Sequence, residues 1–224
     1  MKLSGISSMA TRQVLAELAA GFRAQAGVEV AIESVGGVDA ARRVAAGERF
    51  DIVVLASDAI DKLIAAGHLA MPRVDLMRSP VAIAVREGAP APDVTSGEAV
   101  KRAVEAAASL ASSTGPSGAH VQRLFERWGL ADAVQAKLVQ APPGVPVGSL
   151  VAEGRAELGF QQLSELTGLP GIRVLGTLPA DIAFITTFSA ALPPGAPEAA
   201  RAWLAYAAGP EAADAKRRHG MEPA

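Results

Sequence analysis

The sequence predicts an α/β protein in which short buried strands alternate with amphipathic helices. Half of the 224 residues are hydrophobic and a fifth are charged, which is the composition of a globular protein. Short apolar runs alternate with segments whose apolar residues recur every three or four positions. This alternation of strand and helix is typical of a parallel sheet with right-handed crossover connections.

The first third of the chain contains three strand–helix pairs. The helix expected over 11–25 places Val14, Leu18 and Phe22 on one face and ends at Gly27. The run 50–55 is typical of a buried parallel strand. The strands expected here are 3–6, 28–33 and 50–55, and the helices are 11–25, 38–46 and 58–66.

The alternation continues through the rest of the chain. Residues 81–86 predict another buried strand, and a loop rich in proline and glycine follows over 87–97. The remaining strands are expected at 109–112, 137–140, 158–160, 173–175 and 183–189. The remaining helices are expected at 97–107, 118–128, 149–154, 197–208 and 211–218, with a stiff loop at 142–146.

Two of these strands, 81–85 and 182–186, each follow a strand–helix series and precede a change in composition. We expect them to be two hinge strands that join two Rossmann-like lobes. Lobe 1 then comprises residues 1–83 with 183–224, and lobe 2 comprises residues 84–182.

Composition excludes several classes of function. A formal net charge of −2 argues against a protein that holds nucleic acid by bulk electrostatics. The absence of cysteine excludes disulfides, thiolate metal sites and cysteine nucleophiles. Because His68, His120 and His219 lie far apart, we expect no metal site, and we expect no cofactor. No apolar run reaches the roughly 18–20 residues of a membrane span, so we expect no membrane insertion.

The N-terminal segment leaves the location of the protein open. Residues 1–8 contain one basic residue and no apolar core of signal-peptide length. A cytoplasmic protein that starts at Met1 fits this segment, and so does a periplasmic protein whose signal peptide has been removed.

Four strand-to-helix junctions carry small hydroxyl residues or glycines that we expect to bind an anion. A helix start has unsatisfied N–H groups and a partial positive charge, and junctions of this kind lie at the carboxyl ends of strands, where α/β proteins bind ligands. The alternative is that these residues are ordinary helix caps. The junction at 112–118 is the strongest, because it has more hydroxyls and glycines than one cap needs. The candidate ligand-binding residues are Ser7, Ser8, Ser57, Thr114, Gly115, Ser117, Gly118, Gly148 and Ser149.

A few other polar residues are candidates. Arg78 precedes the first hinge strand, where it either clamps a carboxylate or lies at the surface. Gln161 follows the strand 158–160, where it either faces the ligand or the solvent. His120 is a candidate general base, although no catalytic residue is assigned with it. The basic run 216–218 is expected to complement the dipole of the last helix.

Several segments, in this order and spacing, resemble one known family. They are 5–8, 50–58, 115–118 with the helix that follows to 130, 147–160, 203–204, 209–213 and 216–221. Together they are similar to bacterial type II periplasmic binding proteins, in particular the molybdate-binding protein of ABC transporters. The resemblance implies two lobes that close on a small oxyanion, held by hydroxyls and N–H groups with few positive side chains.

The resemblance also implies which residues bind the ligand. It assigns Ser8 and Ser57 to the first lobe, and the regions near Ser117 and 147–149 to the second. Molybdate binders usually carry a tyrosine after the strand that corresponds to 158–160. This chain has Phe160-Gln161-Gln162 there, which favours a different anion, such as a carboxylate.

The leading hypothesis is therefore a monomeric solute-binding protein that holds a small anion in an interlobe cleft, as the substrate-binding component of an ABC-type transporter with a permease as partner. Two alternatives stay open. The family has an enzyme relative, aconitate isomerase, so an isomerase of a small polycarboxylate is one alternative. A cytoplasmic anion sensor is the other, since the effector domains of LysR-type regulators share this fold.

Overall fold

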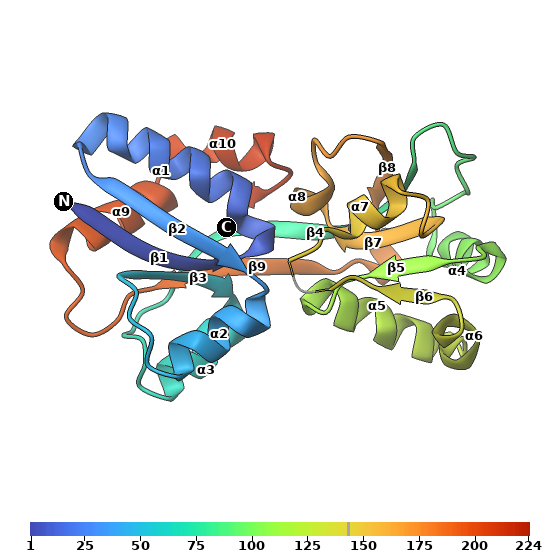
Figure 1. Cartoon of the computed structure of the whole chain (residues 1–224), viewed down its shortest axis with the longest axis horizontal. Coiled ribbons are helices and arrows are strands. Elements are labelled where there is room, and N and C mark those ends of the chain that lie inside the picture. The colour runs from blue at the N-terminus through green and yellow to red at the C-terminus, as the bar shows by residue number, and fades with distance from the viewer. Residues whose placement is uncertain (143) are drawn as a thin grey trace. The chain divides into compact units, whose positions relative to one another are not determined.

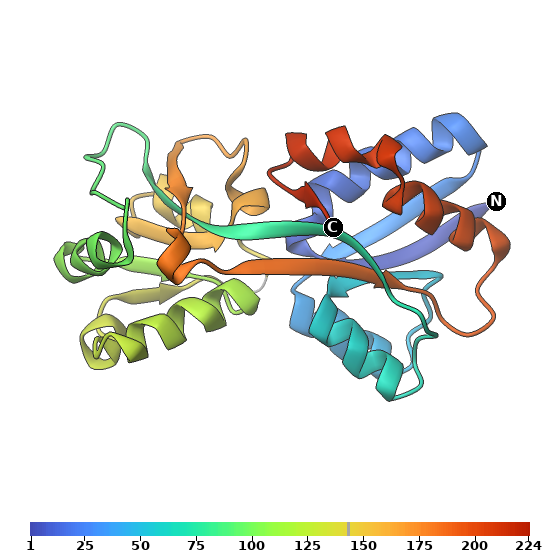
Figure 2. The same cartoon turned by 180° about the vertical axis from the view of Figure 1, so that it is seen from behind.

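The computed structural model describes residues 1–142 and 144–224. Contacts between residues divide the chain into two compact units: unit 1 comprises Met1–Ser79 with Thr187–Ala224, and unit 2 comprises Pro80–Thr186. The chain passes from one unit to the other twice, inside β4 (Val74–Arg86) and inside β9 (Ile185–Ala191) (Figures 1 and 2). They fall at 79/80 and 186/187, whereas the sequence analysis expected 83/84 and 182/183.

Unit 1 is built on a sheet whose first three strands are parallel. The strand order is β2-β1-β3-β9, with β9 antiparallel to β3, while β10 pairs with the first half of β4. The strands are β1 (Lys2–Ser8), β2 (Glu29–Val35), β3 (Ile52–Ala56) and β10 (Glu222–Pro223). The helices are η1 (Met9–Thr11), α1 (Arg12–Ala26), α2 (Gly37–Ala45), α3 (Ser57–Ala65), α9 (Glu198–Ala208), η3 (Pro210–Ala212) and α10 (Ala213–Arg218).

Helices cover both faces of this sheet (Figure 1). On one face α1, α9 and α10 enclose a cluster that contains Trp203 and Phe188, both fully buried. On the other face α2 and α3 pack against Ile6 and Leu55. A parallel strand buried on both faces must be apolar along its whole length, which explains why all five residues of β3 are buried.

Unit 2 contains a second sheet with the strand order β8-β4-β7-β5-β6. Strands β5, β6 and β7 are parallel to one another, whereas β4 runs antiparallel to β7 and β8. Its other strands are β5 (Leu110–Ser112), β6 (Leu138–Gln140), β7 (Leu158–Gln162) and β8 (Ile172–Thr177). Its helices are α4 (Gly97–Ala106), α5 (Pro116–Arg127), α6 (Ala131–Gln135), α7 (Val147–Ala152), α8 (Leu163–Leu166) and η2 (Ala180–Ile182).

The core of unit 2 also has two sides. Phe125 of α5 meets Phe160 of β7 edge to face, with the ring centroids 5.8 Å apart. On the other side α7 packs closely on β7 because Gly159 has no side chain. A Cβ atom at Gly159 would lie 2.6 Å from Val151 and 3.0 Å from Val147.

Most of the differences from the sequence prediction are short elements or shifted ends. Strand β4 begins at Val74, whereas the sequence predicted a start at 81. The first half of the strand was not predicted because polar residues and Pro80 interrupt its apolar pattern. Strand β7 runs on to Gln162, so both glutamines lie inside the strand. The short elements α6, α8 and β10 have no clear sequence signal. Within the expected loop 142–146, residue 143 lies outside the described residues. Across the described part of the chain, no helix is both long enough and apolar enough to span a membrane.

The basic run 216–218 lies in the last turn of α10, as expected, but its first residue is buried. The side chain of Lys216 is only 1% exposed, and it has no ion-pair partner among the residues that the structure describes. Burial lowers the pKa of this ammonium group, because the charged form is poorly solvated in the protein. The buried lysine therefore destabilises the folded state wherever it is protonated.

We predict that Lys216→Met stabilises the protein by about 1 kcal/mol or more, which raises the midpoint of thermal unfolding by about 2–4 °C. Because the native pKa is lowered, the unfolded state binds more protons between that pKa and the ordinary lysine value. The stability of the wild type therefore rises with pH across this window, and the variant loses that rise. Calorimetry across this pH range measures both effects.

Lys62→Met is the matched control, because the Lys62 side chain is 80% exposed and its ion pair with Asp58 lies at the surface. A Lys216→Met variant that melts below the wild type contradicts the interpretation.

Candidate functional site

The carboxyl ends of β1, β2 and β3 form the ligand edge of unit 1, from which α2 and α3 start. The residues before these helices, Gly36 and Ala56, have no side-chain oxygen to accept the first N–H groups, and neither helix has a capping hydrogen bond. Helix α4 differs, because Ser96 Oγ accepts from Ala99 N at 3.2 Å. The starts of α2 and α3 thus keep N–H groups that an external anion can accept from.

Ser8 provides the clearest sign of a ligand at this edge. It ends β1 and is only 7% exposed, yet its Oγ has no hydrogen-bond partner within the described residues. A Cβ atom on Gly37 would lie 3.5 Å from Ser8 Cβ, so the hydroxyl lies beside the start of α2. A buried hydroxyl without a partner is costly unless something binds there, which supports the prediction for Ser8.

Two other predicted serines in unit 1 are engaged inside the protein. Ser7 Oγ lies 2.8 Å from Ser34 Oγ and links β1 to β2. Ser57 Oγ donates to Thr187 O at 3.0 Å and lies 2.7 Å from Ser189 Oγ.

The hydroxyl protons of Ser57 and Ser189 are both used in hydrogen bonds within the protein. Ser189 Oγ donates to Asp75 Oδ1 at 2.6 Å, so the single Ser57 proton serves both Thr187 O and Ser189 Oγ. In this rotamer, therefore, α3 offers a ligand its backbone N–H groups rather than the Ser57 hydroxyl.

Arg78 is exposed on β4, opposite Glu222 of β10 in the strand register. None of the ion pairs found among the described residues includes Arg78, and its role as a carboxylate clamp stays a prediction.

The carboxyl ends of β5, β6 and β7 form the ligand edge of unit 2. Ser112 ends β5, is fully buried, and its Oγ has no hydrogen-bond partner among the residues described. Ser117, in the first turn of α5, is 2% exposed, and its Oγ lies 3.1 Å from Ser113 Oγ. Ser112 begins the junction 112–118 that the sequence analysis singled out, although it was not named as a candidate residue.

The glycines of this edge have packing roles. A Cβ atom on Gly118 would lie 1.7 Å from the carbonyl oxygen of Ser113, so only glycine lets the loop fold onto α5. A Cβ atom on Gly148 would lie 3.1–3.2 Å from three side chains under α7. Gly115 precedes α5 and donates to Ser113 Oγ at 3.3 Å. Thr114 is exposed, and Ser149 is partly exposed at the start of α7.

Gln161 and Gln162 are buried in β7, so the surface alternative for them is wrong. Gln161 Oε1 accepts from Val147 N at 2.8 Å, which uses the first N–H group of α7. Gln162 Nε2 donates to Thr186 Oγ1 at 2.6 Å, while its Oε1 has no partner in the part of the chain that the structure describes. Gln162, like Ser8 and Ser112, thus leaves a buried polar atom free at the end of a strand.

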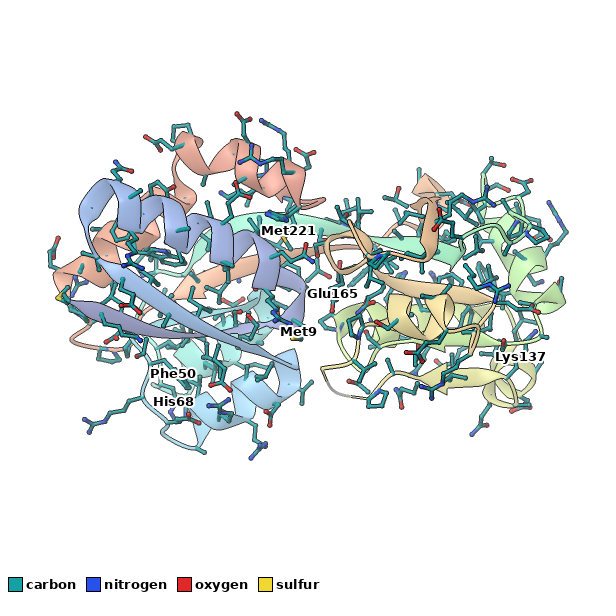
Figure 3. The ribbon with its side chains drawn as sticks, turned by 45° about the horizontal axis from the view of Figure 1, so that its top comes forward. Met9, Phe50, His68, Lys137, Glu165 and Met221 are labelled. Atoms are coloured by element: carbon teal, nitrogen blue, oxygen red, sulfur yellow. The ribbon has the colours of Figure 1, made fainter. Side chains whose placement is uncertain are left out.

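Sequence analysis did not identify Glu165, a carboxylic acid with a strongly raised pKa. Glu165 lies in the first turn of α8, just beyond β7 (Figure 3), and accepts a hydrogen bond of 2.8 Å from Gln161 Nε2. Burial raises the pKa of Glu165 to about 7, although the hydrogen bond from Gln161 favours the ionised form. A single glutamate in a short helix carries no sequence signal, because the desolvation comes from the tertiary structure.

His120, the candidate base, is held in a different environment. Its ring stacks on Phe184, with the centroids 4.3 Å apart and the planes at 12°. Burial lowers its pKa, and it hydrogen-bonds to the backbone of Ile182. These contacts hold the His120 ring against the segment that leads into β9, while its Nε2 has no hydrogen-bond partner among the described residues.

The side chains at these two edges are hydroxyls and amides rather than metal ligands. Among the residues described, no group of three or more His, Asp or Glu side chains is arranged to hold a metal ion. The site elements of both units are helix starts, small hydroxyls and amides at the carboxyl ends of parallel strands. In α/β proteins this arrangement binds small ligands with negative charge.

Comparison with known families places the chain among solute-binding proteins. The chain belongs to the family described as bacterial extracellular solute-binding protein, which it matches over residues 3–222. Among curated proteins it is similar to an aconitate isomerase from a Pseudomonas species. The two are 40% identical over 230 residues, which cover 99% of this chain and 87% of that protein.

Solved structures confirm the predicted fold class. The periplasmic molybdate-binding protein of Azotobacter vinelandii superposes with a TM-score of 0.80 at 21% identity, over 98% of each chain. A tungstate-binding protein from Desulfovibrio alaskensis gives a TM-score of 0.70 at 18% identity, over 100% of this chain and 98% of that one. The chain therefore has the type II periplasmic-binding-protein fold, as its sequence predicted.

We predict that Gly118→Ala destabilises the protein by about 1–3 kcal/mol, because the new methyl group must displace the Ser113 carbonyl. Gly115→Ala is the control, since its nearest contact would be 3.7 Å away, and it should cost less than about 1 kcal/mol. Urea unfolding of both variants measures the difference. Equal stabilities contradict the packing role assigned to Gly118.

Proposed function

We propose that the protein is an isomerase of a small polycarboxylate and that its substrate is aconitate. The observation that carries this proposal is the 40% identity to an aconitate isomerase over 99% of the chain. Membership of a solute-binding family supports a small ligand. The reaction needs two things from the protein, which are groups that bind several carboxylates and one base that moves a proton.

The ligand edges support the first requirement. The uncapped starts of α2 and α3 offer N–H donors, and carboxylates are good acceptors for helix-start N–H groups. Ser8 and Ser112 add hydroxyls that can donate, and Gln162 adds a free amide oxygen that can accept from a protonated carboxyl or an ordered water.

The second requirement follows from the structure of aconitate, which has a CH₂ group next to a C=C bond. Moving the double bond requires that a proton leaves the CH₂ carbon and that a proton is returned to the former vinyl carbon. The exchange involves no oxidant or reductant, so one acid–base group is sufficient.

A solute-binding component of an ABC-type transporter is the second candidate, and family membership favours it. Such a protein binds its ligand and releases it unchanged. The two candidates therefore differ in one observable, which is chemical turnover of the bound ligand.

We predict that the protein converts trans-aconitate to cis-aconitate, and the reverse, in a reaction followed by proton NMR. Thermal unfolding should shift upward with aconitate by mass action, and by less with molybdate at the same concentration. A shift with aconitate but no interconversion assigns the protein to solute binding and contradicts the enzyme proposal.

We also predict that Ser8→Ala raises KM for aconitate about fivefold, as expected for the loss of a hydrogen bond worth about 1 kcal/mol. The free protein should melt at the same temperature or higher, because the lost hydroxyl has no partner in it. Ser96→Ala is the control, and we expect it to change stability but not KM. It removes the cap of α4 and should lower the free energy of unfolding by about 1 kcal/mol. An unchanged KM for Ser8→Ala removes this serine from the site.

A further inference from the structure

A short chain of hydrogen bonds at the ligand edge of unit 2 fixes one carboxylate in place. Val147 N donates to Gln161 Oε1 at 2.8 Å, and Gln161 Nε2 donates to Glu165 Oε1 at 2.8 Å. A backbone N–H group can only donate, so the amide end that faces Val147 must be the oxygen. The orientation of Gln161 is thereby settled, and its NH₂ end must face Glu165.

This arrangement holds one oxygen of Glu165 and leaves the other free. Gln161 is 1% exposed in β7, so its amide is held rigidly. Glu165 lies in α8, four residues further along the chain, and its Oε1 accepts the hydrogen bond from the amide. None of the hydrogen bonds or ion pairs within residues 1–142 and 144–224 uses Oε2.

The electrostatic surroundings of Glu165 suit a group that exchanges a proton near neutral pH. Burial raises its pKa to about 7, the hydrogen bond from Gln161 lowers it, and no charged group in the described chain contributes. A base of this strength takes a proton and returns it with comparable ease at neutral pH.

A carboxylate at this edge is difficult to explain for a protein that only binds anions. A negative charge close to a bound anion weakens binding, and a binding protein gains nothing from it. An enzyme that must remove a proton from its anionic substrate needs such a group. His120, the other candidate, is stacked on Phe184 and tied to the backbone of Ile182.

We propose that Glu165 is the base of the isomerisation and that Gln161 is the residue that positions its carboxylate. This inference rests on the proposed function. Glu165 Oε2 removes a proton from the CH₂ carbon, and the electron pair of that C–H bond forms the new C=C bond to the central carbon. The electrons of the old C=C bond move toward the former vinyl carbon, which takes the proton back from Glu165. Every atom and electron is retained.

The test measures the rate of aconitate interconversion by NMR for the wild type, Glu165→Gln, Glu165→Asp and Glu153→Gln. Glu165→Gln should lower kcat at least 100-fold while aconitate still raises its unfolding temperature. Glu165→Asp keeps a carboxylate on a shorter stem and should retain an intermediate rate. Glu153→Gln removes an exposed charge from the same unit and should match the wild type.

Gln161→Ala tests the positioning role through a pH profile. In the wild type, kcat/KM should rise with pH and level off above about 7, because the base must be ionised. Since the hydrogen bond from Gln161 lowers the pKa of Glu165, removing it should move this rise to higher pH and lower kcat. An unmoved profile overturns the positioning role.

The two levels of the proposal fail in different ways. A wild type that binds aconitate without converting it overturns the proposed function and this inference with it. A wild type that converts aconitate, together with a Glu165→Gln variant that keeps more than a tenth of its rate, overturns only the assignment of Glu165.

Discussion

The constraint on which the molecule depends is that helix starts have N–H groups that the helix itself cannot satisfy. In both units parallel strands end at one edge, and helices start there. At α2 and α3 the preceding residues, Gly36 and Ala56, have no side-chain acceptor, so those donors are left for a ligand. The buried hydroxyls of Ser8 and Ser112 are free at the same edges. In the proposed function, these donors bind the carboxylates of the substrate.

The sequence predicted the fold well because the fold follows from local patterns. Strand–helix alternation and apolar periodicity located α1 and β3 to within a few residues. Elements without a local pattern were not predicted. Helix α8 has only four residues, and the first half of β4 contains polar residues and Pro80. The burial of Lys216 was not predicted either, since a basic residue at a helix end ordinarily lies in solvent.

The site was less predictable than the fold. A small residue at a junction indicates a helix start, but it does not show whether its hydroxyl is free. Ser8 and Ser57 are equivalent in the sequence, yet the first has no partner and the second is tied to Thr187 and Ser189. Hydrogen-bond partners and desolvation come from residues far apart in the chain, so the structure is needed to separate them. Glu165 shows the same limit, because its raised pKa comes from burial.

Under the proposed function, the enzyme differs from a binding protein of the same fold by one acid–base group placed among the hydrogen-bond donors. The most direct test of the anion-binding account is an NMR titration of the backbone amides with tricarballylate, a tricarboxylate that lacks the double bond and cannot isomerise. The account predicts that the N–H signals of Gly37, Ser57 and Ser117, in the first turns of α2, α3 and α5, move with saturation while those at the capped start of α4 do not. Saturable shifts that leave these three amides unmoved would contradict it.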